Sequence, residues 1–377
     1  MKKTNLIKSI AGAMVILMGI SSTDLVKADT IQNKKFESIV QVNDVEIQKT
    51  LHGYLSNKWE EAKEVKIINN EYIAKDSLQK TYDKLKSQYE HKWREEISEK
   101  IEWYKMNINI NSIDIVNGFI KVDVNNDVTF QYEGVDVTSG IKEHHIIYLK
   151  EENGNILVDK DIFDDSLSEI EDIKNIETDF SIDYNFNKYI NEKIEKVTSN
   201  LKVINDSINQ YKSDMKKNIK LSKDNLNSST RLYPRYNGSK AASWALQHVY
   251  DNEVWPGDNC TYFVSSALHA GGLPTDKTWY KDKWCPAWIR VIELRNWLLN
   301  KGYAKETVGQ AYGNEGDVIQ LFNKSKNNWS HSVIVTYTNH RYGNCYVSAH
   351  SNKAYNVSVR NYYPSSTYSN ARTLRLS

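Results

Sequence analysis

The sequence predicts an α+β fold in two parts that a long helix joins. Residues 36–106 show the spacing of amphipathic helices, and β-rich runs separated by turn signals follow them. Residues 184–230 contain no proline or glycine and return to helical spacing. Beyond residue 232, one helix-like run and three strand-like runs indicate a second α+β domain. With 377 residues and 40% hydrophobic content, the chain is long enough for two or three packed domains.

Residues 1–28 have the features of a secretory signal peptide. Three lysines within the first eight residues precede an uncharged stretch, and Val26-Lys27-Ala28 is a small-x-small cleavage pattern. The alternative is an uncleaved membrane anchor, but the fifteen uncharged residues between Lys8 and Asp24 are too few for a bilayer span. We therefore expect a secreted, extracellular or cell-wall-associated protein that is not stably inserted in a membrane after cleavage.

Residues 29–180 are expected to form an N-terminal α+β module. Two or three amphipathic helices are followed, from Ile108, by strands separated by Asn-Gly, Asn-Asn-Asp and Glu-Asn-Gly turn signals. The four expected strands of this meander are Ile113 to Ile115, Phe119 to Val124, Val128 to Tyr132 and His145 to Leu149. In pattern the module resembles the cone-like NTF2-type fold, whose sheet can hold a small ligand. No catalytic constellation stands out, so packing or interaction is its expected role.

Residues 181–232 are expected to form a helical linker. Its apolar residues recur at gaps of three and four, at Ile190, Ile194, Val197, Leu201, Ile204, Ile208 and Tyr211. A polar Asn-Leu-Asn-Ser-Ser-Thr tract follows the helix and is typical of a linker. The pattern leaves open whether this helix is a spacer, a dimer seam or a lid on the neighbouring domain.

Composition changes near residues 231–235, where we place the boundary of a C-terminal domain over 233–377. All five prolines, seven of the ten tryptophans and all three cysteines lie beyond it. This domain has sixteen Lys and Arg against nine Asp and Glu, whereas residues 29–232 carry a net charge of about −9. The basic half can attract the acidic half or an anionic wall polymer such as teichoic acid. No Lys/Arg cluster, RNA-binding signature or zinc finger supports nucleic acid as a partner.

The cysteines Cys260, Cys285 and Cys345 are an odd number for an exported protein. At least one thiol therefore stays free or pairs with another chain. A bridge between Cys285 and Cys345 and two buried thiols are both compatible with the sequence. No CxxC, HExxH or acidic calcium-loop spacing is present, so we expect neither a metal nor another cofactor.

Cys260 opens the apolar, helix-like run of the C-terminal domain. Asp258 or Asn259 is a suitable N-cap, and Gly271-Gly272 is a suitable stop. The positive end of a helix dipole favours thiolate, which is the nucleophilic form of cysteine. A structural cysteine would more naturally take a core position of the helix. The placement therefore makes Cys260 a candidate nucleophile.

His331 begins a strand-like run seventy-one residues later. Three consecutive antiparallel strands are predicted, over 316–321, 332–337 and 345–349. A hairpin centred between residues 340 and 341 would place His350 opposite His331, with Asn352 one diagonal step away. A later two-residue turn would place Ala354 there instead. A catalytic histidine needs a third polar group to orient it, and this register supplies two candidates.

Three motifs carry a resemblance to a known family. They are Asp258-Asn259-Cys260-Thr261-Tyr262-Phe263-Val264-Ser265 with Leu268-His269-Ala270-Gly271-Gly272-Leu273-Pro274, then Gly316-Asp317-Val318-Ile319-Gln320, then Trp329-Ser330-His331-Ser332-Val333 with Val347-Ser348-Ala349-His350-Ser351-Asn352. In this order they resemble the putative amidase domain family (Amidase_6), which is similar to NlpC-type and CHAP cysteine peptidases of the papain-like superfamily. The resemblance spans residues 236–360.

The resemblance implies a papain-like cysteine amidase domain that cleaves amides by acyl transfer. Cys260 would be the nucleophile, His331 the general base and then acid, and His350 or Asn352 its orienting group. The backbone N–H of Cys260 would help to stabilise the oxyanion, and Asn259 is a candidate second donor. Four aromatic residues are candidates for contact with substrate: Tyr262, Trp279, Trp284 and Trp329.

The substrate expected for an exported amidase is peptidoglycan or another amide-containing polymer. Tyr262 departs from the family pattern, which usually has asparagine beside the threonine, so activity or specificity can differ here. One alternative is a wall-binding or interaction protein that keeps the fold without activity. Another is a secreted effector or bacteriocin-like toxin whose N-terminal module binds a target.

Overall fold

The computed structural model describes residues 45–163, 182–225, 235–252, 259–350 and 353–376. The predicted signal peptide, most of the polar tract after residue 225, Asp258 and Asn352 lie outside these ranges. The described chain is of mixed α+β type with a ten-stranded antiparallel sheet, which confirms the predicted class.

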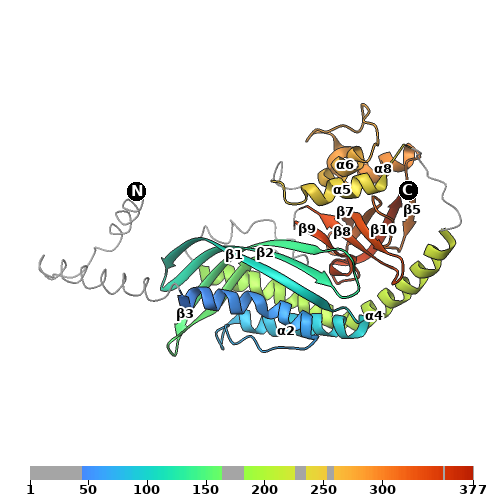
Figure 1. Cartoon of the computed structure of the whole chain (residues 1–377). Coiled ribbons are helices and arrows are strands. Elements are labelled where there is room, and N and C mark those ends of the chain that lie inside the picture. Colours follow the sequence, from blue (N-terminus) through green and yellow to red (C-terminus); the bar gives the residue numbers. More distant parts are fainter. Residues whose placement is uncertain (1–44, 164–181, 226–234, 253–258, 351–352, 377) are drawn as a thin grey trace, which may run out of the picture. The chain divides into compact units, whose positions relative to one another are not determined.

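The N-terminal module consists of helices followed by a meander of four antiparallel strands (Figure 1). A helix over residues 45–64 precedes α2 (Leu78–Ile97), which begins where Ser77 Oγ accepts a hydrogen bond from the Lys80 backbone N–H. The strands are β1 (Ile101–Val116), β2 (Phe119–Tyr132), β3 (Ser139–Glu152) and β4 (Asn155–Phe163).

The module has an antiparallel meander of four strands, but they are not the four predicted: residues 119–124 and 128–132 are one strand, β2, and β4 was not predicted. Residues 101–106, expected to be helical, are the start of β1. The Asn-Asn-Asp signal over 125–127 is not a turn: the triplet pairs with residues 107–109 inside a single strand, β2. The asparagine side chains find partners across strands, since Asn126 Nδ2 donates to Glu143 Oε2 at 3.1 Å. Asparagine favours turns because its side chain can hydrogen-bond to the nearby backbone. Here the side chain bonds across the strands instead, which stabilises the extended conformation.

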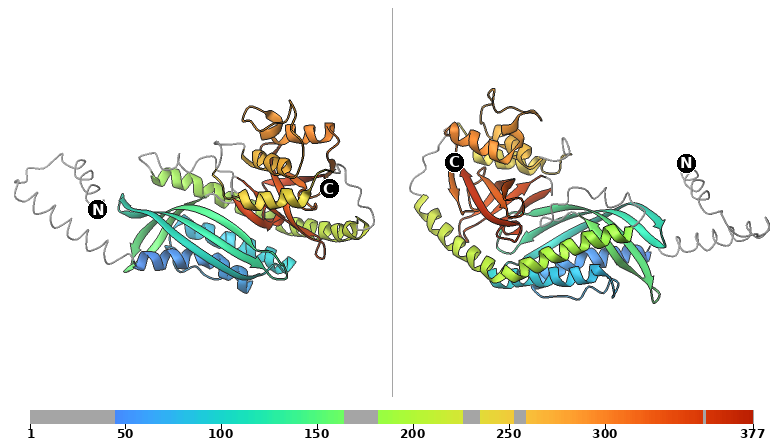
Figure 2. Two further views of the ribbon diagram at one scale, coloured as in Figure 1. Left: turned by 45° about the horizontal axis from the view of Figure 1, so that its top comes forward. Right: turned by 180° about the vertical axis from the view of Figure 1, so that it is seen from behind.

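The long predicted helix is α4 (Ile182–Asn225). It lies beside α2, and both views in Figure 2 show the two helices on one face of the β1–β4 sheet. The predicted apolar stripe of α4 packs against the rest of the same chain. Its residues are buried in the core beneath the sheet: Ile190, Val197, Ile204, Ile208 and Tyr211. Burial of this stripe stabilises the helix far more than its intrinsic propensity does.

The C-terminal domain places helices on one face of a six-stranded sheet. The helices are α5 (Gly238–His248), α6 (Asn259–Ala270), α7 (Pro286–Ile289) and α8 (Val291–Asn300). The strands are β5 (Lys305–Val308), β6 (Val318–Asn323), β7 (Asn328–Asn339), β8 (Asn344–Ala349), β9 (Ala354–Ser358) and β10 (Tyr368–Arg375), in the order β9-β8-β7-β6-β10-β5. The predicted helix and three strands correspond to α6, β6, β7 and β8, whereas β5, β9 and β10 were not predicted.

Each face of the C-terminal sheet belongs to a different core. Ile334 packs with α5 to α8, whereas its neighbours Val333 and Val335 belong to the core shared with α2 and α4. This alternation is the period of two expected for a strand buried on both faces.

Two kinds of contact join the C-terminal domain to the module. Strand β3 pairs with β9 through Gly140 with Tyr355 and Ile141 with Ala354. Arg360, in the short 3-10 helix η1 (Val359–Asn361) after β9, forms ion pairs with Glu90 and Glu99 of the module. The module therefore supports the same sheet that carries His331.

Candidate active site

Cys260 is the second residue of α6. The helix is held by its apolar side, where Phe263, Val264 and Leu268 pack into the core above the sheet. This anchoring leaves Cys260 in the first turn, where backbone N–H groups have no partner within the helix. The residue is 9% exposed, so it is nearly buried but still at the protein surface.

The imidazole of His331 lies close enough to the Cys260 thiol to influence its pKa. Burial alone would raise the pKa of the thiol. The influence of the His331 imidazole, a hydrogen bond from the Ser332 backbone and a contact with the Thr261 hydroxyl outweigh burial, so the pKa is lowered from its usual value. The structure thus joins the two predicted residues and favours the thiolate, as catalysis by cysteine requires.

His331 lies on β7 where the strand is irregular. It pairs with Leu321 of β6, but the next pair is Trp329 with Phe322, so Ser330 is the extra residue of a bulge. Bulges re-aim side chains and are common beside active sites.

The imidazole of His331 is packed against two tyrosine rings. Its centroid lies 5.7 Å from that of Tyr362 and 6.2 Å from that of Tyr368, at interplanar angles of 29° and 22°. Both tyrosines are buried. Because rings of this size have few alternative rotamers in a packed core, they restrict the plane of the imidazole.

A buried polar network fixes the start of α6 against the sheet. Thr261 Oγ1 donates to Ser332 Oγ at 3.2 Å, and Gln320 Nε2 donates to the same oxygen at 3.2 Å. Arg372 Nε in turn donates to Gln320 Oε1 at 2.8 Å. The network links α6, β7, β6 and β10. Thr261 and Ser332, which follow Cys260 and His331 in the sequence, therefore hold α6 and β7 in a fixed position relative to each other. The sequence pattern did not predict this network, although Thr261, Gln320 and Ser332 lie within the motifs.

The predicted position of His350 is wrong by one residue. Ile334 pairs with Ser348, whereas the expected register would pair it with Val347. A shift of one residue moves a side chain to the other face of the sheet. His350 accordingly stacks on Phe263 of α6, with ring centroids 5.0 Å apart, instead of facing His331 across the strands. Burial, then the charge of Lys353, lowers its pKa, so at neutral pH it is an uncharged ring. The other candidate, Asn352, lies outside the described residues.

The remaining predicted residues divide into core and surface. Asn259 is the first residue of α6 and is 2% exposed. Tyr262 is buried, with its ring against Trp288. Trp279 is fully buried between Trp288 and Trp297. It therefore packs in the core and is not exposed for the predicted contact with substrate.

Two tryptophans remain accessible for substrate contact. Trp284 is 77% exposed. Trp329 is partly exposed two residues before His331, and the Arg372 guanidinium lies 4.1 Å from its ring centroid. This cation–π contact fixes the indole at the end of the strand that carries the histidine.

The three cysteines are all free thiols, so no bridge joins Cys285 and Cys345. Burial, with the charge of Asp317, raises the pKa of Cys345 to about 12, which keeps it protonated at neutral pH. No group of three or more His, Cys, Asp or Glu side chains that could hold a metal ion occurs among the described residues. None of the helices in the described part of the chain combines the length and apolar character that a membrane span needs.

A family model matches the part of the chain that carries the site. Residues 229–373 match the family model described as "Putative amidase domain" (Amidase_6), which confirms the predicted resemblance. The match supports a hydrolase that acts on amides. Similarity to NlpC-type or CHAP peptidases, and the NTF2-like character of the module, stay predictions.

One curated protein is similar over part of the chain. A stretch of 142 residues is 33% identical to "Uncharacterized protein YjcM" of Bacillus subtilis (strain 168). The alignment covers 34% of this chain and 33% of that protein, so the chain spans about one third of the length of this relative. No solved structure gives a significant match.

Proposed function

We propose that the C-terminal domain is a cysteine amidase in which Cys260 attacks an amide carbonyl and His331 transfers the proton. The observation that carries the proposal is the placement of Cys260 in the first turn of α6 within reach of His331, whose influence helps to lower the pKa of the thiol. The amidase family match over residues 229–373 supports the reaction class.

The reaction begins when the Cys260 sulfur adds to the carbonyl carbon and His331 holds the thiol proton. Negative charge develops on the carbonyl oxygen, and the backbone N–H of Cys260 in the first turn of α6 is a donor for it. His331 then protonates the nitrogen of the leaving amine as the carbon–nitrogen bond breaks. Water, deprotonated by the same histidine, cleaves the thioester and releases the acid and the free thiol.

The geometry around His331 supports a second feature of the mechanism. In place of a facing His350, the stacked rings of Tyr362 and Tyr368 hold the plane of the imidazole. We infer that they act as positioning residues. Asn352 stays a candidate for the group that accepts the other imidazole N–H.

We further propose that the protein is exported and acts on wall peptides. Support comes from the signal-peptide pattern of residues 1–28 and from the excess of positive charge in the C-terminal domain, sixteen Lys and Arg against nine Asp and Glu. An anionic wall would concentrate such a domain at its surface. Trp329, fixed beside His331, is the side chain best placed to contact a sugar or peptide portion of that substrate.

The test is to incubate the mature protein with purified sacculi and to follow the release of amino groups. We expect release by the wild type and none by Cys260→Ala. Cys285→Ala is the matched control, because this thiol is buried and donates instead to the Thr278 carbonyl oxygen. Equal release by wild type and Cys260→Ala contradicts the mechanism. If the wild type releases nothing from sacculi but cleaves another amide, only the wall substrate is refuted.

A further inference from the structure

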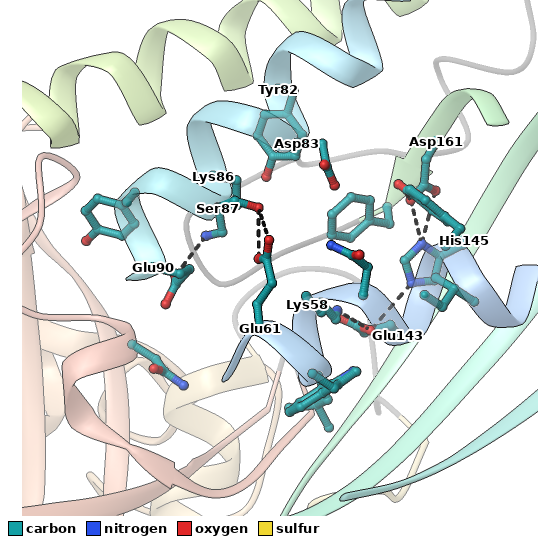
Figure 3. A pocket seen from close by; sticks show the side chains of 18 of the residues that line it. Lys58, Glu61, Tyr82, Asp83, Lys86, Ser87, Glu90, Glu143, His145 and Asp161 are labelled. Carbon is teal, nitrogen blue, oxygen red and sulfur yellow. Dashed lines mark hydrogen bonds and ion pairs between the residues drawn. The ribbon is translucent and has the colours of Figure 1, made fainter. Parts of the chain in front are cut away.

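A cavity of about 250 Å³ lies within the N-terminal module (Figure 3). Its walls come from the helix over 45–64, from α2, β3 and β4, and from the segment around η1 of the C-terminal domain. Neither Cys260 nor His331 lines it. Its volume is slightly below the usual range for ligand pockets, roughly 300–1,000 Å³, so a ligand that fits it is small.

Three of the carboxylates that line the cavity are neutralised by cations. Glu143 pairs with Lys58 at 2.6 Å, and Asp161 pairs with His145 at 3.0 Å. Glu90 pairs with Lys86 at 3.4 Å, and also with Arg94 and Arg360. These three carboxylates already have cationic partners within the chain, and Arg360 pairs with Glu99 as well.

Glu61 and Asp83 line the same space and form no ion pair within the described chain, although the charge of Arg94 acts on Glu61 (Figure 3). Glu61 accepts hydrogen bonds from Ser87 Oγ at 2.9 and 2.8 Å, and within the described chain neither carboxylate forms an ion pair. Burial, followed by the charge of Glu61, raises the pKa of Asp83 to about 7. Lys80, which acts against this shift, hydrogen-bonds Asn69 and Asn70. Glu61 also accepts a hydrogen bond from the Ile68 backbone N–H at 2.9 Å, and it is buried, whereas Asp83 is partly exposed. Carboxylates that are removed from water without an ion pair are costly to keep in a folded protein.

Gln79 adds an acceptor to the same cavity wall, and its orientation follows from its neighbours. Burial lowers the pKa of His145, but Asp161 and Glu143 outweigh it and raise that pKa to about 9. Tyr54 donates its hydroxyl proton to Asp161 at 2.8 Å, so its oxygen must accept from Gln79 Nε2 at 2.9 Å. The Gln79 Oε1 atom is therefore an acceptor. Gln79 is only 1% exposed, and no described residue donates a hydrogen bond to this buried oxygen.

Six aromatic rings also line the cavity. The rings that contribute are Tyr54, Trp59, Tyr82, Tyr89, Phe163 and Tyr362. Aromatic faces attract cations and provide apolar contact for the body of a ligand. A bare metal ion does not fit this lining, since no described group of side chains could hold one.

We propose that this cavity binds a small organic cation, namely a primary ammonium group on an aromatic or apolar body. The ammonium group lies between Glu61 and Asp83 and donates a further hydrogen bond to Gln79 Oε1. The body lies against the aromatic walls. Charge-assisted hydrogen bonds of this kind are roughly twice as strong as neutral ones, which makes the charge of the ligand decisive.

The test is isothermal titration of the full chain at pH 8, above the pKa of about 7 of Asp83, with phenethylamine, tryptamine and cyclohexylamine. The neutral isostere 2-phenylethanol is titrated in parallel. We expect at least one amine to bind with one-to-one stoichiometry and to raise the melting temperature, and the alcohol not to bind. Asp83→Asn and Glu61→Gln should each weaken amine binding about tenfold or more, as loss of a charged partner does.

Two control variants make the result interpretable. Glu64→Gln removes a carboxylate that is exposed on the same helix, and it should bind as the wild type does. Cys260→Ala should also bind as the wild type does, which separates this cavity from the proposed amidase site. Circular dichroism confirms that each variant is folded. The proposal is overturned if none of the amines binds, if 2-phenylethanol binds equally well, or if folded Asp83→Asn and Glu61→Gln keep wild-type affinity.

Discussion

Arg360 is the residue whose replacement should most weaken the joint between the C-terminal domain and the module. Its side chain is 2% exposed and lies 2.6 Å from Glu99 and 3.4 Å from Glu90. The guanidinium also lies 5.6 Å from the ring centroid of Trp93. Removing it leaves two carboxylates against an apolar surface without their main cation.

The size of the effect follows from Glu90. Burial by itself raises the pKa of this carboxyl, but Arg360, ahead of Lys86 and Arg94, lowers it to about 2 from 4.5. A shift of this size corresponds to about 3 kcal/mol, and breaking a buried ion pair typically costs about 3–5 kcal/mol. Since Glu90 keeps Lys86 and Arg94, we expect Arg360→Met to lower the free energy of unfolding by about 3 kcal/mol at pH 7.

The assay is urea denaturation followed by circular dichroism, with Lys92→Met as the matched control. Lys92 forms an ion pair with Glu96 on the same helix at 2.7 Å, but the two side chains are 38% and 36% exposed. Exposed pairs contribute little, so the control should be nearly neutral. A double variant, Arg360→Met with Glu99→Gln, should recover part of the loss because it removes one uncompensated charge.

The pH dependence of the free energy of unfolding tests the same ion pair. Because the folded pKa of Glu90 is depressed, its stabilising effect is present above pH 4.5 and is lost as pH falls toward 2. The difference between wild type and Arg360→Met should therefore shrink over that interval. Equal stability of Arg360→Met and Lys92→Met at pH 7 would refute the reasoning.

Three further predictions concern single groups. Asp83→Asn should stabilise the protein at pH 8 by on the order of 2–4 kcal/mol and hardly at pH 4. The pKa of Asp83 is raised to about 7 in the folded protein, so folding is penalised once the pH exceeds the lower pKa that this carboxyl has in the unfolded chain. Thermal melts at both pH values check this. Ser332→Ala should lower the free energy of unfolding by about 1–3 kcal/mol, because Thr261 and Gln320 lose their shared acceptor; an unchanged value in urea denaturation would contradict the network. Titration of native protein with a disulfide reagent at neutral pH should modify Cys260 but leave Cys345, whose pKa is about 12, unmodified until the protein unfolds.

The site residues with strong local signals could be predicted from the sequence. Cys260 follows a helix-start pattern and begins an apolar run, and α6 indeed begins at Asn259. His331 begins a strand-like run, which is buried over residues 331–336 and lies within β7. Patterns of this kind depend only on neighbours in the sequence, so they persist in the folded chain.

The register between β7 and β8 could not be predicted because it depends on two irregular features. The turn is longer than expected, since Asn339 pairs with Asn344 and Gly343 adopts a φ of 69°. A further shift lies between Val335 and Tyr337. Alternation of apolar residues is unchanged by either feature, yet together they decide which face His350 occupies.

The groups that surround His331 were also beyond prediction. Tyr362 and Tyr368 come from a segment after the last motif, and only the folded sheet brings them to the imidazole. In the module, Glu61 and Asp83 look like ordinary charged positions on amphipathic helices. Their burial in one cavity depends on how the two helices pack on the sheet.

The central claim is that His331 activates Cys260 for attack on a carbonyl group. The most direct measurement is the rate at which a peptide-like electrophile labels Cys260 at neutral pH, read by intact mass and peptide mapping. We predict one adduct, at Cys260, formed faster than with an ordinary thiol and slowed about tenfold or more in His331→Ala, with folding confirmed by circular dichroism. Equal labelling rates in wild type and His331→Ala would contradict the account.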